Sequence, residues 1–385
     1  MEIPQEFESM RSFEDSEVQS AIKSLLEDTR FRKTVLDGIL KGIPMWAIKL
    51  YLSLFKTIDG FQRGVIYPFV LKKILRDSSS GFSHNFKKVM PKNREDYLFL
   101  SNHRDIVLDS AYLDYILLPS GKSSVEIGIG NNLLIYPWIE TLVRLNRSFV
   151  VNRSASAAEL IKTSENLSSY IRFVITQKHK PVWLAQREGR AKDSDDRTQK
   201  SVLKMLTMSG EGSLKERLIS LNITPLTISY EFDPCDYLKA QEFQLKRDNP
   251  EFKKSKQDDL DNMKTGMKGY KGHIHYQVSE PIDEEIAALD ESVPRNQYLD
   301  QVAAIIDKHI FKGYKIYPSN RIALDMLRGD NSQSAYYTDK DKRKFEKYLE
   351  GQLKKITIPD PDWDYLKERI LTMYANPLIN QLSVM

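Results

Sequence analysis

The chain has 385 residues, of which 41% are hydrophobic and 29% are charged, and its net charge is +4. This composition indicates a globular protein rather than a disordered one, and the small positive charge does not require nucleic acid as a partner. The single cysteine, Cys235, excludes an intramolecular disulfide and cannot complete a Cys/His zinc site. We therefore expect a protein of a reducing compartment that uses no metal and binds no nucleic acid.

Residues 1–85 are predicted to form an N-terminal helical region. Residues 18–40 have the polar, amphipathic pattern of a helix, whereas residues 41–76 carry seven basic residues, one acidic residue (Asp59) and a broad apolar face. Such a segment can lie in a membrane interface, with lysines near anionic head groups, or can pack on a domain, and the pattern leaves both open. No apolar run is long enough to span a membrane. We expect a cytoplasmic protein, peripheral on the cytoplasmic face of the membrane.

Residues 77–85 are predicted as a loop, and after it short strand signals alternate with helical stretches. The expected helices cover residues 106–118, 135–145, 155–177 and 198–209. The expected strands cover residues 97–100, 125–129, 148–152, 181–186, 223–230 and 274–278. This alternation predicts an α/β domain over residues 86–290, with a mixed, largely parallel sheet flanked by helices. Residues 291–385 are predicted to form a helical C-terminal region.

The first of these strands ends in the sequence NHRDIVLD, which places His103 in a turn before a helix. Histidine can accept a proton near neutral pH, and a neighbouring carboxylate can fix its tautomer. One residue separates Asp105 from His103, and five separate Asp109 from it. Asp105 precedes the apolar helix and can cap it. We therefore expect Asp109, one turn inside the helix, to meet His103 across the turn.

Three further strands carry polar or special residues. The arginine of SFVVNR could bind a phosphate in a bidentate way, and the glycine of QREGRAK permits a sharp turn or a close approach of the backbone to a ligand. A proline stands near the start of ITPLTISY, where a strand tolerates it. Each motif has an ordinary structural explanation by itself. The residues singled out are Arg153, Glu188, Gly189, Arg190, Lys192 and Pro225.

In this order, the four segments resemble the motifs of the glycerolipid acyltransferases, which include glycerol-3-phosphate and 1-acylglycerol-3-phosphate acyltransferases. NHRDIVLD is similar to the first motif of the family, SFVVNR to the second, QREGRAK to the third and ITPLTISYE to the fourth. The resemblance covers residues 95–282, about half of the chain. Two features differ: the family separates its histidine and aspartate by four residues rather than five, and its third turn is one residue longer.

The resemblance implies an O-acyltransferase of membrane lipid synthesis that uses no cofactor. The donor would be acyl-coenzyme A or an acyl-carrier protein, and the acceptor a lysophospholipid or glycerol phosphate at a membrane surface. His103 would be the general base, Asp109 would orient it, and Pro225 would shape the acyl or donor pocket. The anionic head would be bound by Arg104, Arg153, Glu188, Gly189, Arg190 and Lys192.

Three alternatives stay open at this point. The altered third turn allows the hydroxyl of an N-acyl amino acid lipid as acceptor. The same histidine could act on water in a thioesterase or hydrolase. A protein that only binds a membrane or a nucleic acid is the third alternative, but the lysines at 253–256 are followed by aspartates, which favours a solvated helix face.

Overall fold

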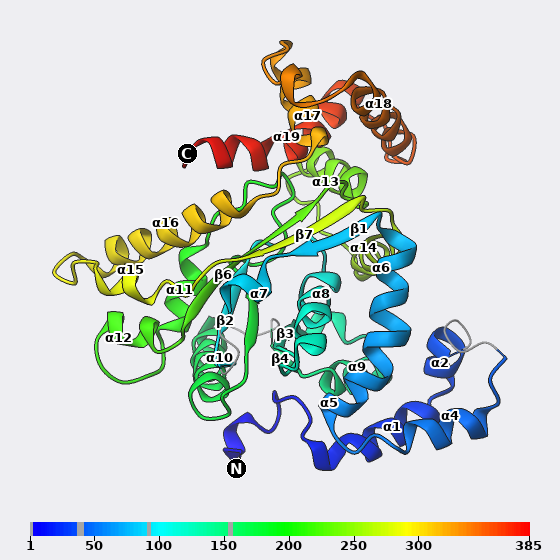
Figure 1. Ribbon diagram of the computed structural model, residues 1–385, viewed down its shortest axis with the longest axis vertical. Helices are drawn as coiled ribbons and strands as arrows, with labels where there is room; N and C mark the ends of the chain where they lie inside the picture. The colour runs from blue at the N-terminus through cyan, green and yellow to red at the C-terminus, as the bar shows by residue number, and fades with distance from the viewer. Residues whose placement is uncertain (1–2, 37–41, 91–93, 153–156) are drawn as a thin grey trace.

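The computed structural model describes residues 3–36, 42–90, 94–152 and 157–385. Its centre is a seven-stranded sheet with the strand order β1-β7-β6-β2-β5-β3-β4 (Figure 1). All neighbouring strands are parallel except β6 and β7. The predicted α/β fold with a mixed, largely parallel sheet is therefore confirmed. The strands are β1 (Gly81–His84), β2 (Leu98–Ser101), β3 (Glu126–Gly130), β4 (Ser148–Val151), β5 (Val182–Ala185), β6 (Ile223–Tyr230) and β7 (His273–Val278).

Helices cover both faces of the sheet, because side chains alternate between the faces along each strand. Leu98 and Leu100 of β2 belong to one hydrophobic cluster, and Phe99 between them belongs to another. The helices between the strands are α7 (Phe86–Val89), α8 (Leu108–Leu117), α9 (Pro137–Leu145), α10 (Ala157–Thr176), α11 (Lys200–Leu206), α12 (Leu214–Ile219), α13 (Asp236–Asp248) and α14 (Lys256–Lys268), with short turns η5 (Leu118–Ser120) and η6 (Asn131–Leu133).

The described part of the N-terminal region is helical, as predicted, except for one strand, β1, which joins the sheet. Its elements are η1 (Gln5–Phe7), η2 (Asp15–Glu17), α1 (Val18–Glu27), α2 (Thr29–Phe31), η3 (Arg32–Leu36), α4 (Met45–Leu52), α5 (Ile58–Phe61), η4 (Gln62–Leu71) and α6 (Lys72–Ser78). Residues 37–41 of the predicted helical stretch lie outside the described residues. In the part of the chain that is described, no helix is long and apolar enough to cross a membrane.

The prediction of a loop over residues 77–85 is wrong for residues 81–84. Gly81–His84 form β1, which pairs in parallel with β7 over its whole length. The sequence GFSH carries little strand signal, because three of its four residues are glycine or polar and Phe82 is the one apolar residue that packs on the core. β1 thus precedes the predicted boundary at residue 85, and the division of the chain at 85 and 290 stays a prediction.

After β7 the chain forms five further helices, and the last three share a hydrophobic cluster, the C-terminal cluster, with Phe232 and with Ala240 of α13. The five helices are α15 (Asp283–Ala287), α16 (Arg295–Gly313), α17 (Pro318–Arg328), α18 (Asp339–Leu353) and α19 (Trp363–Leu382), together with the short turn η7 (Ser334–Tyr336). α16 packs on the sheet, whereas α17, α18 and α19 gather beyond α13 (Figure 1). Pro318 begins α17, where its missing N–H costs nothing.

Candidate active site

The turn between β2 and α8 brings His103 and Asp109 together. Nδ1 of His103 lies 2.8 Å from Oδ2 of Asp109. The same oxygen accepts the backbone N–H groups of Arg104 at 2.6 Å and Asp105 at 3.0 Å, and Oδ1 accepts the hydroxyl of Tyr230 at 3.4 Å. The expected contact across the turn is therefore present. Hydrogen bonds from three other residues hold the carboxylate of Asp109 in place beneath the imidazole.

Asp105 has a different position at the start of α8. Its Oδ1 accepts the backbone N–H groups of Val107 at 2.9 Å and Leu108 at 2.8 Å. Burial raises the pKa of Asp105, and the nearby charge of Asp109 raises it further. Asp105 thus satisfies donors at the helix start, as the sequence predicted. The fifth intervening residue is accommodated in the turn before α8.

The second imidazole nitrogen of His103 points away from Asp109. Among the described residues none forms a hydrogen bond with Nε2, and the side chain is 14% exposed. The ring lies edge-on to Trp183 of β5, with 5.7 Å between the ring centroids, and Trp183 is fixed by a hydrogen bond from its Nε1 to Ser101. When Nδ1–H donates to Asp109, Nε2 keeps its lone pair. The arrangement can therefore accept a proton from a group that arrives from solvent.

The predicted binding residues of the third motif lie on the turn after β5, at the edge of the sheet where His103 lies. Glu188 and Gly189 are exposed. Gly189 has φ of +67°, a conformation that disfavours other residues, although no atom would crowd an added Cβ. Arg190 donates a hydrogen bond of 2.8 Å to Asn262 of α14. Arg153 of the second motif lies outside the described residues.

The other two predicted binding residues are Lys192, on the loop after β5, and Pro225, in β6. Lys192 forms an ion pair with Glu242 of α13, and burial lowers the pKa of Lys192 to about 8. Pro225 is in register with Leu100, three residues before His103, which is about 10 Å along the sheet. Lys192 is therefore paired with another residue of the protein, and Pro225 lies inside the sheet.

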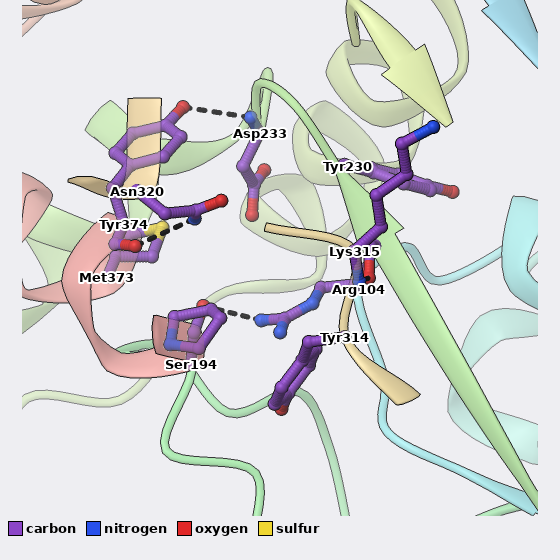
Figure 2. A pocket seen from close by; sticks show the side chains of 11 residues that line it. Arg104, Ser194, Tyr230, Asp233, Tyr314, Lys315, Asn320, Met373 and Tyr374 are labelled. Atoms are coloured by element: carbon purple, nitrogen blue, oxygen red, sulfur yellow. Dashed lines mark hydrogen bonds between the residues drawn. The ribbon is translucent and has the colours of Figure 1, made fainter. Parts of the chain in front are cut away.

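Arg104 was predicted to bind substrate, but its side chain is buried, with only 6% of the residue exposed. It donates to Asp196 at 2.5 Å. It also donates to Ser194 and lies over the ring of Tyr314, 5.8 Å from the centroid (Figure 2). The cavity beside it has a volume of about 30 Å³. A space of this size holds about one water molecule and no lipid head group. The contacts of Arg104 are with the protein itself.

Sequence reasoning missed two residues near this edge. Arg187 lies in the bend directly after β5, at the edge of the sheet where His103 lies. Its buried Nε has no hydrogen-bond partner among the described residues. The first arginine of QREGR was the available signal, but the motif drew attention to Arg190. Asp196 is the second, and nothing in its local sequence marks it.

Comparison with known proteins adds little to this geometry. No protein family model matches the chain, and no curated protein is similar to it in sequence. Among solved structures, the chain is similar to the 1-acyl-sn-glycerophosphate (LPA) acyltransferase PlsC from Thermotoga maritima, with a TM-score of 0.35 and 13% sequence identity. The match covers 75% of this chain and 97% of that one. At this level of similarity the functional argument rests on the site itself.

Proposed function

We propose that the protein is an O-acyltransferase that moves a fatty acyl group from acyl-coenzyme A or an acyl-carrier protein to the hydroxyl of a lysophospholipid or glycerol phosphate. One observation carries the proposal: Nδ1 of His103 is held by the buried carboxylate of Asp109 at 2.8 Å, and Nε2 is open to a substrate. The four strand-end motifs that resemble glycerolipid acyltransferases support the choice of reaction.

In this mechanism Nε2 of His103 takes the proton of the acceptor hydroxyl as its oxygen attacks the thioester carbonyl. Asp109 stabilises the imidazolium that forms. The tetrahedral intermediate then collapses, the C–S bond breaks, and the departing thiolate takes the proton from His103. An acyl-enzyme on Cys235 is disfavoured, because the thiol is buried and burial raises its pKa to about 12.

The anionic head of the acceptor would be bound by Arg187 and Arg190, on the turn after β5. A guanidinium group suits a phosphate because it can donate two parallel hydrogen bonds. Nε of Arg187 has no partner among the described residues, whereas Arg190 is already bonded to Asn262. We expect Arg187→Gln to raise the acceptor KM about tenfold or more and to leave the donor KM unchanged, as measured by steady-state kinetics with each substrate varied.

A membrane surface is proposed as the source of the lipid substrates. Helix α4 and the residues after it expose large apolar side chains, with Trp46 69% and Leu54 67% exposed. The exposed Lys49 and Lys56 lie among them. Apolar side chains in the acyl boundary with lysines at the head groups are typical of peripheral binding, and the cytoplasmic leaflet supplies the anionic lipids.

The decisive experiment measures the products of the purified chain by lipid mass spectrometry. Acyl-coenzyme A or acyl-carrier protein is supplied with a panel of lysophosphatidic acid, glycerol-3-phosphate and N-acyl amino acid lipid. We expect His103→Asn to lower acyl transfer by about 10² to 10⁴-fold, and the matched change of the exposed histidine, His179→Asn, to leave it intact. Near wild-type transfer by His103→Asn overturns the proposal.

The same assay separates the proposal from a thioesterase, which would use the His103–Asp109 pair on water. Release of free fatty acid that does not depend on any acceptor identifies a hydrolase. Acceptor-dependent formation of an ester identifies a transferase, and the acceptor that is consumed identifies the substrate class.

A further inference from the structure

The side of the β2–α8 turn that faces away from Asp109 is built around one buried carboxylate. Asp196 is fully buried, and its Oδ2 accepts hydrogen bonds from Asn102 at 3.1 Å and Arg104 at 2.5 Å. These are the two residues on either side of His103. The backbone that carries the imidazole is therefore anchored on both sides by the same oxygen atom.

The anchoring of Asn102 extends to the neighbouring strand. Its Oδ1 accepts the backbone N–H of Ile228 at 2.8 Å, and its Nδ2 donates to the carbonyl of Ile228 at 3.0 Å. The side-chain amide thereby replaces a backbone ladder pair between the end of β2 and β6. Buried polar networks of this kind fix a single geometry, because each group loses its solvation if the geometry is lost.

The third donor to Asp196 comes from the C-terminal region. The hydroxyl of Tyr314, between α16 and α17, donates to Oδ2 at 2.5 Å. Figure 2 shows both Tyr314 and Ser194 next to the guanidinium group of Arg104. The loop that carries Asp196 is also held by α19, because Asn376 donates to the carbonyl of Asp193 at 2.8 Å and Asn380 donates to Asp195 at 3.2 Å.

We propose that Asp196 is a positioning residue for His103, and that it couples the C-terminal helical region to the candidate active site. The residue does not touch the reacting atoms. It holds Asn102 and Arg104 so that the imidazole faces Asp109 on the opposite side of the turn. The expected loss of turnover rests on the proposed function, but the orientation of His103 can be measured without it.

The first measurement is nitrogen-15 NMR of the full-length protein labelled at histidine, with the His103 signal assigned from His103→Asn. In the wild type we expect the Nδ1–H tautomer, held by Asp109. Asp196→Asn should lower the population of this tautomer at least twofold, and Tyr314→Phe should change it less but in the same direction. The matched surface changes are Asp300→Asn and Tyr336→Phe, both at exposed residues, and should leave the signal unchanged.

The second measurement is kinetic. A displacement of a catalytic group by about 1 Å can cost about 10²-fold in rate. We expect Asp196→Asn to lower kcat by this order for each folded molecule, with the acceptor KM within about threefold of wild type. If Asp196→Asn does not fold, the same two measurements on Tyr314→Phe test the proposal. This variant removes one hydroxyl and keeps the ion pair between Asp196 and Arg104.

A wild-type tautomer together with an unchanged kcat in Asp196→Asn overturns the proposal, even if the variant is less stable, because the role of Asp196 is then structural. A changed tautomer supports the proposal whether or not the wild type transfers acyl groups. Absence of acyl transfer in the wild type overturns the proposed function alone.

Discussion

Helices α1 and α4 of the N-terminal region and helices α17, α18 and α19 of the C-terminal region lie at opposite ends of the long axis of the molecule, with the sheet between them (Figure 1). Both regions were expected to be helical, yet they differ in what their side chains contact. Trp46 of α4 and Leu54, just after this helix, are exposed to solvent. Helix α19 buries Tyr374 in the C-terminal cluster and directs Asn376 toward the loop that carries Asp196.

The difference shows that a helical sequence pattern does not by itself predict what the helix contacts. None of the described residues covers Trp46 on the apolar face of α4. This exposure agrees with a lipid surface as the partner of that face. The polar side chains of α19 bind the loop behind His103. The proposed roles follow this difference: contact with a lipid surface for the first region and support of the site for the second.

The largest expected effect is on the C-terminal side of this comparison. Tyr374 is buried, its hydroxyl donates to Asp236 at 2.8 Å and accepts the N–H of Asp233 at 2.9 Å, and its ring packs against Phe345. Tyr374→Ala should lower the free energy of unfolding by about 3 to 5 kcal/mol, measured by urea denaturation. Trp46→Ala should change it by no more than about 0.5 kcal/mol. Equal losses would remove the distinction between the two regions.

The next effect concerns pH. Burial raises the pKa of Asp236 to about 7, and the neighbouring charge of Asp233 adds to this. The folded state thus holds a proton that the unfolded chain releases near pH 4, so the contribution of Asp236 to stability is present below pH 4 and is lost as the pH rises through 7. Relative to Asp236→Asn, the wild type should lose roughly 2 to 4 kcal/mol between pH 4 and pH 8, measured by urea denaturation at each pH. A constant difference would contradict this.

The N-terminal side predicts a smaller effect, on binding instead of folding. Burial of one large apolar side chain in a lipid interface is worth about 1.5 to 3 kcal/mol. Trp46→Ala and Leu54→Ala should each weaken sedimentation with anionic liposomes about tenfold, while the unfolding curve stays unchanged. Tyr336→Ala, at an exposed aromatic residue of the opposite end, serves as the control. Unchanged liposome binding in both α4-side variants would assign the exposed face to another partner.

The sheet and the His103–Asp109 contact could be predicted because each depends on local signals. Apolar runs such as those of β2, β5 and β6 are recognisable in sequence, and the ends of parallel strands share one edge of a sheet. β1 could not be predicted, since its pairing with β7 joins residues about 190 positions apart and its sequence is polar.

Arg104 illustrates why the site was predicted only in part. At a strand end, successive side chains turn to opposite faces, so His103 faces Trp183 while Arg104 faces Asp196. The sequence NHRD alone does not predict which of these two faces is open to substrate. The partner that settles this, Asp196, is 92 residues away in the sequence and becomes visible only when the loop after β5 is folded against β2.

The smallest expected effect tests whether surface charge also holds the C-terminal region in place. Lys344 of α18 forms an ion pair of 2.6 Å with Glu231, just after β6, but the lysine side chain is 52% exposed. An ion pair of this kind contributes about 0 to 1 kcal/mol and is screened by salt. Lys344→Met should therefore lower the free energy of unfolding by less than about 1 kcal/mol, and the loss should shrink in high salt.

The exposed Lys347 on the same helix provides the matched change, Lys347→Met, with no measurable effect expected. A loss for Lys344→Met comparable to that of Tyr374→Ala would mean that the region is held by its surface charges, and that buried contacts such as those of Tyr374 are not what joins it to the sheet.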